Sequence, residues 1–201
     1  MAEPRRPYYV SFTIERIPAS VDHSRSNPGP ARKGPDRAGH TSIFLDSGGG
    51  PQFVPLTGPP RRDGMVPFQY RSINVRFSLH TFVVAISSDY PVGSCPYDAT
   101  KRHEFEAHLY HPIRIFWRHR DPLIATLNKI AVPTDSAPRW VRTADVPALR
   151  VGFENQVNEA VFKAFQNLKL ALKTASAIDD DVEHYRPVYN QCPPAQWSQK
   201  R

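Results

Sequence analysis

Histidine and glutamate side chains concentrate in one short stretch, Thr100–His111, with the sequence TKRHEFEAHLYH. The neutral imidazole of histidine binds zinc, and a carboxylate can bind the metal or accept a proton from metal-bound water. No other stretch gathers so many histidine and glutamate side chains. We therefore expect a site for zinc, or another divalent metal, in this part of the chain.

The spacing within this stretch is helical. On a regular α-helix the side chains of Glu104, His108 and His111 fall within an arc of about 60°, beside the apolar stripe that starts at Phe105. In this arrangement these three residues bind the metal, and Glu106 or a distant acid acts as the base.

The segment His103-Glu-Phe-Glu-Ala-His108 resembles the HExxH helix of zincin-type metallopeptidases. In that motif two histidines one turn apart hold zinc, and the glutamate activates the bound water. Here Ala107 stands where the motif has its second histidine, which follows one residue later, and the likeness covers about six residues. The resemblance implies a zinc-dependent hydrolase that acts on a peptide or amide bond.

The displaced histidine leads to a second arrangement. His103 and His108 diverge by about 140° on a regular helix, whereas a π-bulge would bring residues five apart onto one face. In that case His103 and His108 bind the metal and Glu104 is the base.

The sequence leaves the remaining ligands open. A further ligand could come from Glu154, from Glu159 or from the segment Asp179–His184, and His119 joins the strip only if the helix runs straight through Pro112. The alternative is that all these histidines are surface or hydrogen-bonded structural residues.

Charge suggests a second, non-enzymatic function. The chain has 26 Lys and Arg against 19 Asp and Glu, a net charge of +7, which attracts anionic partners. In this alternative, basic Pro-rich loops at 22–39 and 57–67 contact an acidic protein partner or nucleic acid in a binding or assembly protein. Because no nucleic-acid motif or Lys/Arg block is present, we expect the acidic protein rather than nucleic acid.

The two cysteines, Cys95 and Cys192, stand far apart and form no CxxC pair, which argues against a thiolate zinc site. If they pair, the disulfide adds about 4–5 kcal/mol of stability and indicates an exported or periplasmic protein. If they do not pair, we expect a cytoplasmic one. No apolar run approaches the roughly 20 residues of a membrane span and no signal peptide is seen, so we expect a soluble protein.

Alternating apolar and polar residues predict a mostly antiparallel sheet in the N-terminal half. We expect His40–Asp46 and Gln52–Leu56 to form a hairpin. In the longest strand, the side chains of Val75, Phe77, Leu79, Thr81 and Val83 should share one face. The predicted strands are Tyr8–Ile17, His40–Asp46, Gln52–Leu56 and Ile73–Ser87.

Helical periodicity replaces the strand pattern after Asp98, with Asp98 or Thr100 as the expected N-cap. Pro112 and Pro122 should divide the first helical region, and Glu154–Ser176 should form a second helix. A short strand is expected at Trp140–Val141. We therefore predict a single α+β domain, residues 1–201, in which the sheet packs against two long helices. The predicted apolar stripes are Phe105, Leu109, Ile113, Phe116, Leu123, Leu127 and Ile130 in the first region, and Val157, Val161, Ala164, Phe165, Leu168, Leu172 and Ala175 in the second. The tail, 179–201, is expected to be irregular.

Overall fold

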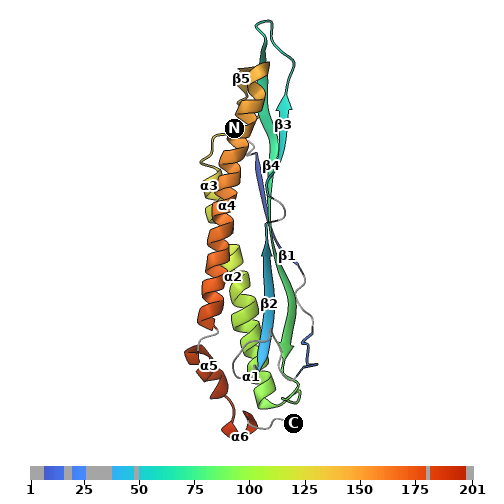
Figure 1. The fold of residues 1–201 in the computed structure, drawn as a ribbon, viewed down its shortest axis with the longest axis vertical. Coiled ribbons are helices and arrows are strands. Elements are labelled where there is room, and N and C mark those ends of the chain that lie inside the picture. The colour runs from blue at the N-terminus through green and yellow to red at the C-terminus, as the bar shows by residue number, and fades with distance from the viewer. Residues whose placement is uncertain (1–6, 16–19, 26–37, 48–49, 180–181, 198–201) are drawn as a thin grey trace. The chain divides into compact units, whose positions relative to one another are not determined.

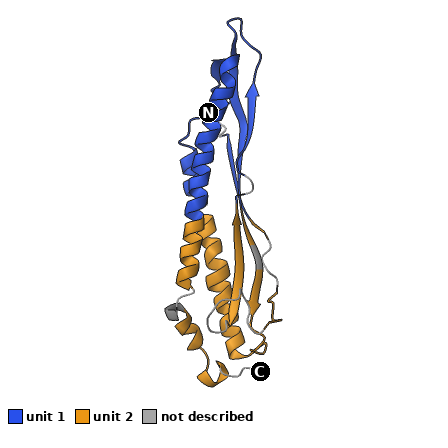
Figure 2. Ribbon diagram, viewed as in Figure 1, with its two compact units in different colours: residues 1–13, 47–77, 118–168 blue, residues 14–46, 78–117, 169–201 orange. Residues whose placement is uncertain are grey.

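The structure is a computed structural model that describes residues 7–15, 20–25, 38–47, 50–179 and 182–197, with the backbone alone at 81–82 and 182–184. Five strands and several helices confirm the α+β class (Figure 1). The chain divides into two compact units (Figure 2). Unit 1 contains residues 1–13, 47–77 and 118–168, and unit 2 contains residues 14–46, 78–117 and 169–201.

Strand β4 (Met65–Ile86) contributes to both units and pairs with every other strand. In unit 1 its antiparallel partners are β3 (Gln52–Thr57) and β5 (Arg139–Arg142), and β1 (Tyr8–Glu15) also pairs with it. The strand expected at Trp140–Val141 is thereby confirmed. The buried face of this sheet packs on helix α4 (Val146–Asp179), where Phe68 lies 6.3 Å from Phe153 between ring centroids. The core of unit 1 includes Phe12, Val66, Phe68, Tyr70, Ile73, Val75, Phe77, Leu123, Leu127, Val141, Val157, Val161 and Leu168.

In unit 2 the end of β4 pairs antiparallel with β2 (Gly39–Asp46). The register shifts where Ser42 faces Val83 but Ile43 faces Thr81, so Phe82 is an extra residue in β4. Such a bulge reverses the alternation of the faces. Val83 is accordingly 38% exposed, whereas its neighbour Val84 is fully buried. The prediction that Val83 shares the buried face of Val75 and Leu79 was wrong for this reason.

The predicted hairpin between His40–Asp46 and Gln52–Leu56 was also wrong, because both strands pair with β4 instead. The hairpin that does form joins β3 to β4. Its tight turn is closed by a bond from the Arg61 N–H to the Met65 carbonyl, with Gly64 at a φ of 76°, a backbone conformation that glycine adopts without strain. The expected loop at 57–67 therefore ends earlier, since Met65 already belongs to β4. Most of the other expected loop, 22–39, lies outside the described residues.

The first helical region is helical without a gap from Cys95 to Arg118, with a π-helix between two α-helices, and it is interrupted at His119, close to Pro122. Its segments are α1 (Cys95–His103), the π-helix η1 (Glu104–Tyr110), α2 (His111–Arg118) and α3 (Arg120–Leu127). Pro122 lies in the first turn of α3, where a missing N–H costs little, whereas Pro112 directly follows the π-helix, inside the continuous helical run. The N-cap of α1 is Ser94, whose hydroxyl accepts the Tyr97 N–H at 3.4 Å, and not Asp98 or Thr100. Leu109, Phe116, Leu123 and Leu127 of the predicted stripe are buried.

Helix α4 confirms the second predicted helix and begins earlier, at Val146, with Pro147 in its first turn. Val157, Val161, Leu168 and Ala175 of the predicted stripe are buried. The tail contains two short helices, α5 (Val182–Tyr189) and α6 (Pro194–Trp197), where an irregular chain was expected. Among the described residues, no helix combines the length and the apolar character that crossing a membrane requires.

Two tyrosines in unit 1, one buried and one partly buried, give a prediction for alkaline pH. The hydroxyl of Tyr8 donates to the Ile130 carbonyl and that of Tyr70 to the Arg150 carbonyl. Burial raises the pKa of each from 10.0 to about 12, and the charge of Glu154 adds to the shift at Tyr70. Since a raised pKa in the folded state favours the neutral phenol, the stability these groups contribute is complete below pH 10 and is lost between pH 10 and about 12.

We expect the unfolding free energy of the Tyr70→Phe variant to change less with pH, above pH 10, than that of the parent chain. Near neutral pH the variant should be about 1 kcal/mol less stable than the parent chain, because it lacks the hydrogen bond. Above pH 10 it should lose less stability per pH unit than the parent, because it lacks the phenol whose pKa is raised. Denaturant titrations at a series of pH values measure both effects. Tyr9→Phe, at an exposed position, is the matched control, and equal pH dependence in both variants would contradict the assignment.

Candidate functional site

The π-helix η1 determines the geometry of the histidine-rich segment. Pro112 has no N–H, and in an α-helix its ring would clash with the carbonyl of residue 108. Immediately before it, the His111 N–H donates to the Glu106 carbonyl five residues back, as in a π-helix. The sequence left a regular α-helix and a π-bulge as alternatives, and the structure has the π-helical form, which is wider.

The widened turn brings His103 and His108 together. Their Nε2 atoms are 3.1 Å apart, and the rings meet edge to face with centroids 4.9 Å apart. Two imidazole nitrogens bound at 2.0–2.1 Å to one tetrahedral zinc ion lie roughly 3.3 Å apart. The same separation also fits a hydrogen bond between two neutral rings, one donating and one accepting. The pair is therefore compatible with both a bound metal and a direct hydrogen bond.

Tyr185 of α5 covers this histidine pair. Its ring centroid lies 4.3 Å from that of His103 and 6.5 Å from that of His108. Only 9% of His108 is exposed. The pair is thus partly enclosed by an aromatic ring, which lowers the competition from water.

A disulfide holds α5 in this position. The sulfur atoms of Cys95 and Cys192 lie at bonding distance, 2.06 Å, and join the start of α1 to the chain just after α5. Cys192 packs with Ala99 of α1 and Val188 of α5 in a small buried cluster. The covalent link and this cluster therefore anchor α5, with Tyr185, against the helix that carries His103.

Glu104 lies in a different environment from the histidines. It is 1% exposed, and the Thr41 hydroxyl of β2 donates to its Oε2 atom at 2.7 Å. Gly39, also on β2, is so close that a Cβ there would lie 2.7 Å from both the Glu104 side chain and the Cγ2 of Thr100. The carboxylate is therefore held against β2, while His103 and His108 contact α5.

This close approach predicts a large effect of Gly39→Ala. The added methyl group would overlap the buried side chains of Glu104 and Thr100, and such overpacking typically costs about 1–3 kcal/mol. Denaturant unfolding should show a loss of this size. Gly152→Ala on α4 is the control, because nothing lies within 4 Å of its Cβ position. We expect that change to be neutral or to stabilise by up to about 1 kcal/mol, and an equally neutral Gly39→Ala would contradict the packing.

The other predicted site residues are not gathered with the pair. His111 contacts Asp179, with 2.9 Å between Nδ1 and Oδ2, and Asp179 is buried at the end of α4. Glu106 is exposed, at a shallow pocket that Lys101 and Tyr110 also line. Over the described ranges, no group of three or more His, Cys, Asp or Glu side chains is arranged to hold a metal ion. The side chains of 180–184, considered from the sequence as ligands, lie outside what the structure describes.

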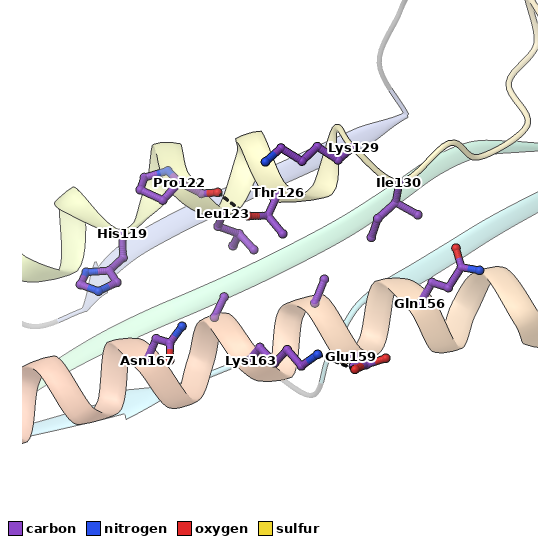
Figure 3. Close-up of a pocket in the computed structure, with 12 residues that line it drawn as sticks. His119, Pro122, Leu123, Thr126, Lys129, Ile130, Gln156, Glu159, Lys163 and Asn167 are labelled. Atoms are coloured by element: carbon purple, nitrogen blue, oxygen red, sulfur yellow. Dashed lines mark hydrogen bonds and ion pairs between the residues drawn. The ribbon is translucent and has the colours of Figure 1, made fainter.

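A separate cavity of about 590 Å³ lies between α3 and α4 in unit 1 (Figure 3). His119 lines it from the α3 side, and Glu159 lines it from α4, where it forms an ion pair with Lys163. Glu154 pairs instead with Arg150 at 2.7 Å. Of the further ligands considered from the sequence, Glu154 and Glu159 are thus each paired with a basic side chain, and His119 lines the cavity.

Sequence reasoning missed three residues that shape the site. Thr41 and Gly39 lie on β2, and Tyr185 lies in the tail. Their contacts with η1 and α1 are between segments distant in the chain, so helical spacing carries no signal for them. The position of Cys192 near Tyr185 was the one available hint, since a disulfide to Cys95 had to bring the tail to α1.

Comparisons of the chain with protein family models, with curated proteins and with solved structures found no match.

Proposed function

We propose that the protein is a zinc-dependent hydrolase of peptide or amide bonds, in which His103 and His108 bind the metal ion. The observation that carries this proposal is the 3.1 Å separation of their two Nε2 atoms across a π-helical turn. Helix distortions of this kind often occur at functional sites, since a π-bulge interrupts regular hydrogen bonding.

A zinc ion held by His103 and His108 would supply Lewis-acid chemistry, because it would lower the pKa of a bound water and make that water a nucleophile toward a peptide or amide carbonyl. Glu104, which the resemblance assigns as proton acceptor, would take a proton from the bound water and return it to the departing amine. Its Oε2 atom accepts the Thr41 hydroxyl of β2, so the proposal requires this carboxylate to turn from β2 toward the histidine pair when the metal binds. The partly enclosing ring of Tyr185 supplies the apolar wall that such a site needs.

The disulfide adds a proposal about location. Disulfides persist in oxidising compartments and are rare in the cytosol. Since Cys95 and Cys192 are at bonding distance, we place the protein among exported or periplasmic proteins.

Hydrolysis of a fluorogenic peptide library, with and without added zinc, tests the function. We expect cleavage that requires zinc, stops on adding a chelator and returns when zinc is restored. Glu104→Gln should retain the metal and lose at least about 100-fold in kcat. A chain that binds zinc stoichiometrically but cleaves no peptide would contradict the hydrolase and leave only a metal-binding protein.

A further inference from the structure

Arginine side chains gather in unit 1 around the β3–β4 turn and β5. All are exposed, and none forms an ion pair with a described residue. The carboxylate in the turn, Asp63, accepts the Met65 N–H at 3.1 Å. The guanidinium groups are therefore exposed and form no ion pair among the described residues. The arginines are Arg61, Arg62, Arg71, Arg139 and Arg142.

Strand register places part of this charge beside an exposed tryptophan. In β5 the side chain of Val141 is buried, so Trp140 and Arg142 project from the opposite face of the strand. Opposite them on β4 lie Pro67 and Met65. We call the set Arg61, Met65, Pro67, Trp140 and Arg142 the arginine–tryptophan surface.

The guanidinium of Arg61 stacks on the ring of Trp140, 3.3 Å from its centroid. Stacking restricts the flexible arginine and leaves its planar edge available for hydrogen bonds. Trp140 remains 36% exposed. The surface thus offers a partly ordered cation and an adjoining apolar area.

The composition of this surface is typical of protein interfaces. Tryptophan, methionine and arginine are enriched at such interfaces and lysine is depleted, and Trp and Arg dominate the binding energy. The guanidinium fork also matches the two oxygens of a carboxylate. We propose that the arginine–tryptophan surface docks an acidic polypeptide segment, whose carboxylates pair with Arg61 and Arg142 and whose apolar side chains pack on Trp140, Met65 and Pro67.

Single-stranded nucleic acid fits this surface less well. Its bases bind by stacking on open aromatic faces, and Arg61 already covers one face of Trp140. This docking function goes beyond the proposed hydrolase. All of its residues belong to unit 1, whereas His103 and His108 belong to unit 2.

The experiment measures fluorescence anisotropy of a fluorescein-labelled peptide with interspersed glutamates and leucines, and of the same peptide with glutamine in place of glutamate. We expect the glutamate peptide to bind and the glutamine peptide not to bind. The double variant Arg61→Ala/Arg142→Ala and the single variant Trp140→Ala should each weaken it by about tenfold or more. The double variant Arg61→Lys/Arg142→Lys, which keeps the charge and loses the fork, should lie between parent and alanine.

The matched control removes two exposed arginines of α2, Arg114→Ala/Arg118→Ala, and should keep the parent affinity. Equal weakening by this control would overturn the proposal, because net charge alone would then explain binding. So would failure of the parent chain to bind the glutamate peptide. Oligothymidylate or heparin bound as tightly as the peptide, with no effect of Trp140→Ala, would likewise overturn it in favour of a simple polyanion site.

Discussion

Replacing Cys95 with serine is expected to lower the free energy of unfolding by about 4–5 kcal/mol. The Cys95–Cys192 disulfide spans 97 residues of sequence, and a cross-link over so long a loop removes much conformational freedom from the unfolded chain. The loss is a large share of the total stability of a typical domain. Denaturant unfolding of the parent and the variant measures it.

The same substitution also tests what the disulfide positions. Without it, α5 keeps noncovalent contacts with α1, which include the small cluster around Val188 and Ala99 and the contact of Tyr185 with His103, so Tyr185 should leave the histidine pair more readily. Parent chain treated with a reductant is the control and should match the untreated variant. A difference in unfolding free energy below about 1 kcal/mol would contradict the disulfide.

The second large effect concerns metal affinity. We expect His108→Ala to weaken zinc binding by at least about 100-fold, because removing a direct ligand should cost no less than the 10–100-fold loss seen for supporting residues. His103→Ala should cause a similar loss. Adding the second substitution to the first should change little, since one remaining imidazole binds zinc weakly and the two act as a unit.

The control for this series is His119→Ala, which removes a histidine that lines the separate cavity in unit 1. It should leave zinc affinity unchanged. Comparable losses at His119 and His108 would show that zinc binds surface histidines generally, which would contradict a site at His103 and His108.

Periodicity was sufficient to predict the class of fold and most of its elements. Apolar residues at helical spacing gave the buried positions Leu109, Phe116, Val161 and Leu168, because solvent exclusion acts on whole faces of an element. Features that depend on one inserted residue were not predictable in this way. The bulge at Phe82 reverses the faces of β4, and nothing in the alternation of apolar residues before it signals the change.

Strand partners and the site itself depended on contacts between distant segments. β3 pairs with its neighbour in sequence, β4, whereas β2 skips β3 and pairs with the far end of β4, a choice that strand patterns alone do not specify. The candidate site illustrates the same limit. Helical spacing placed His103 and His108 five residues apart and left two helical forms open, and the effect of Pro112 on the preceding turn accounts for the form observed.

Calorimetric titration of the metal-free chain with zinc shows whether His103 and His108 form a metal site. We expect one zinc ion to bind per chain, and the double variant His103→Ala/His108→Ala to lose that binding while circular dichroism shows the fold retained. If the parent chain binds no zinc, or the double variant binds it equally well, His103 and His108 are a hydrogen-bonded structural pair and not a metal site.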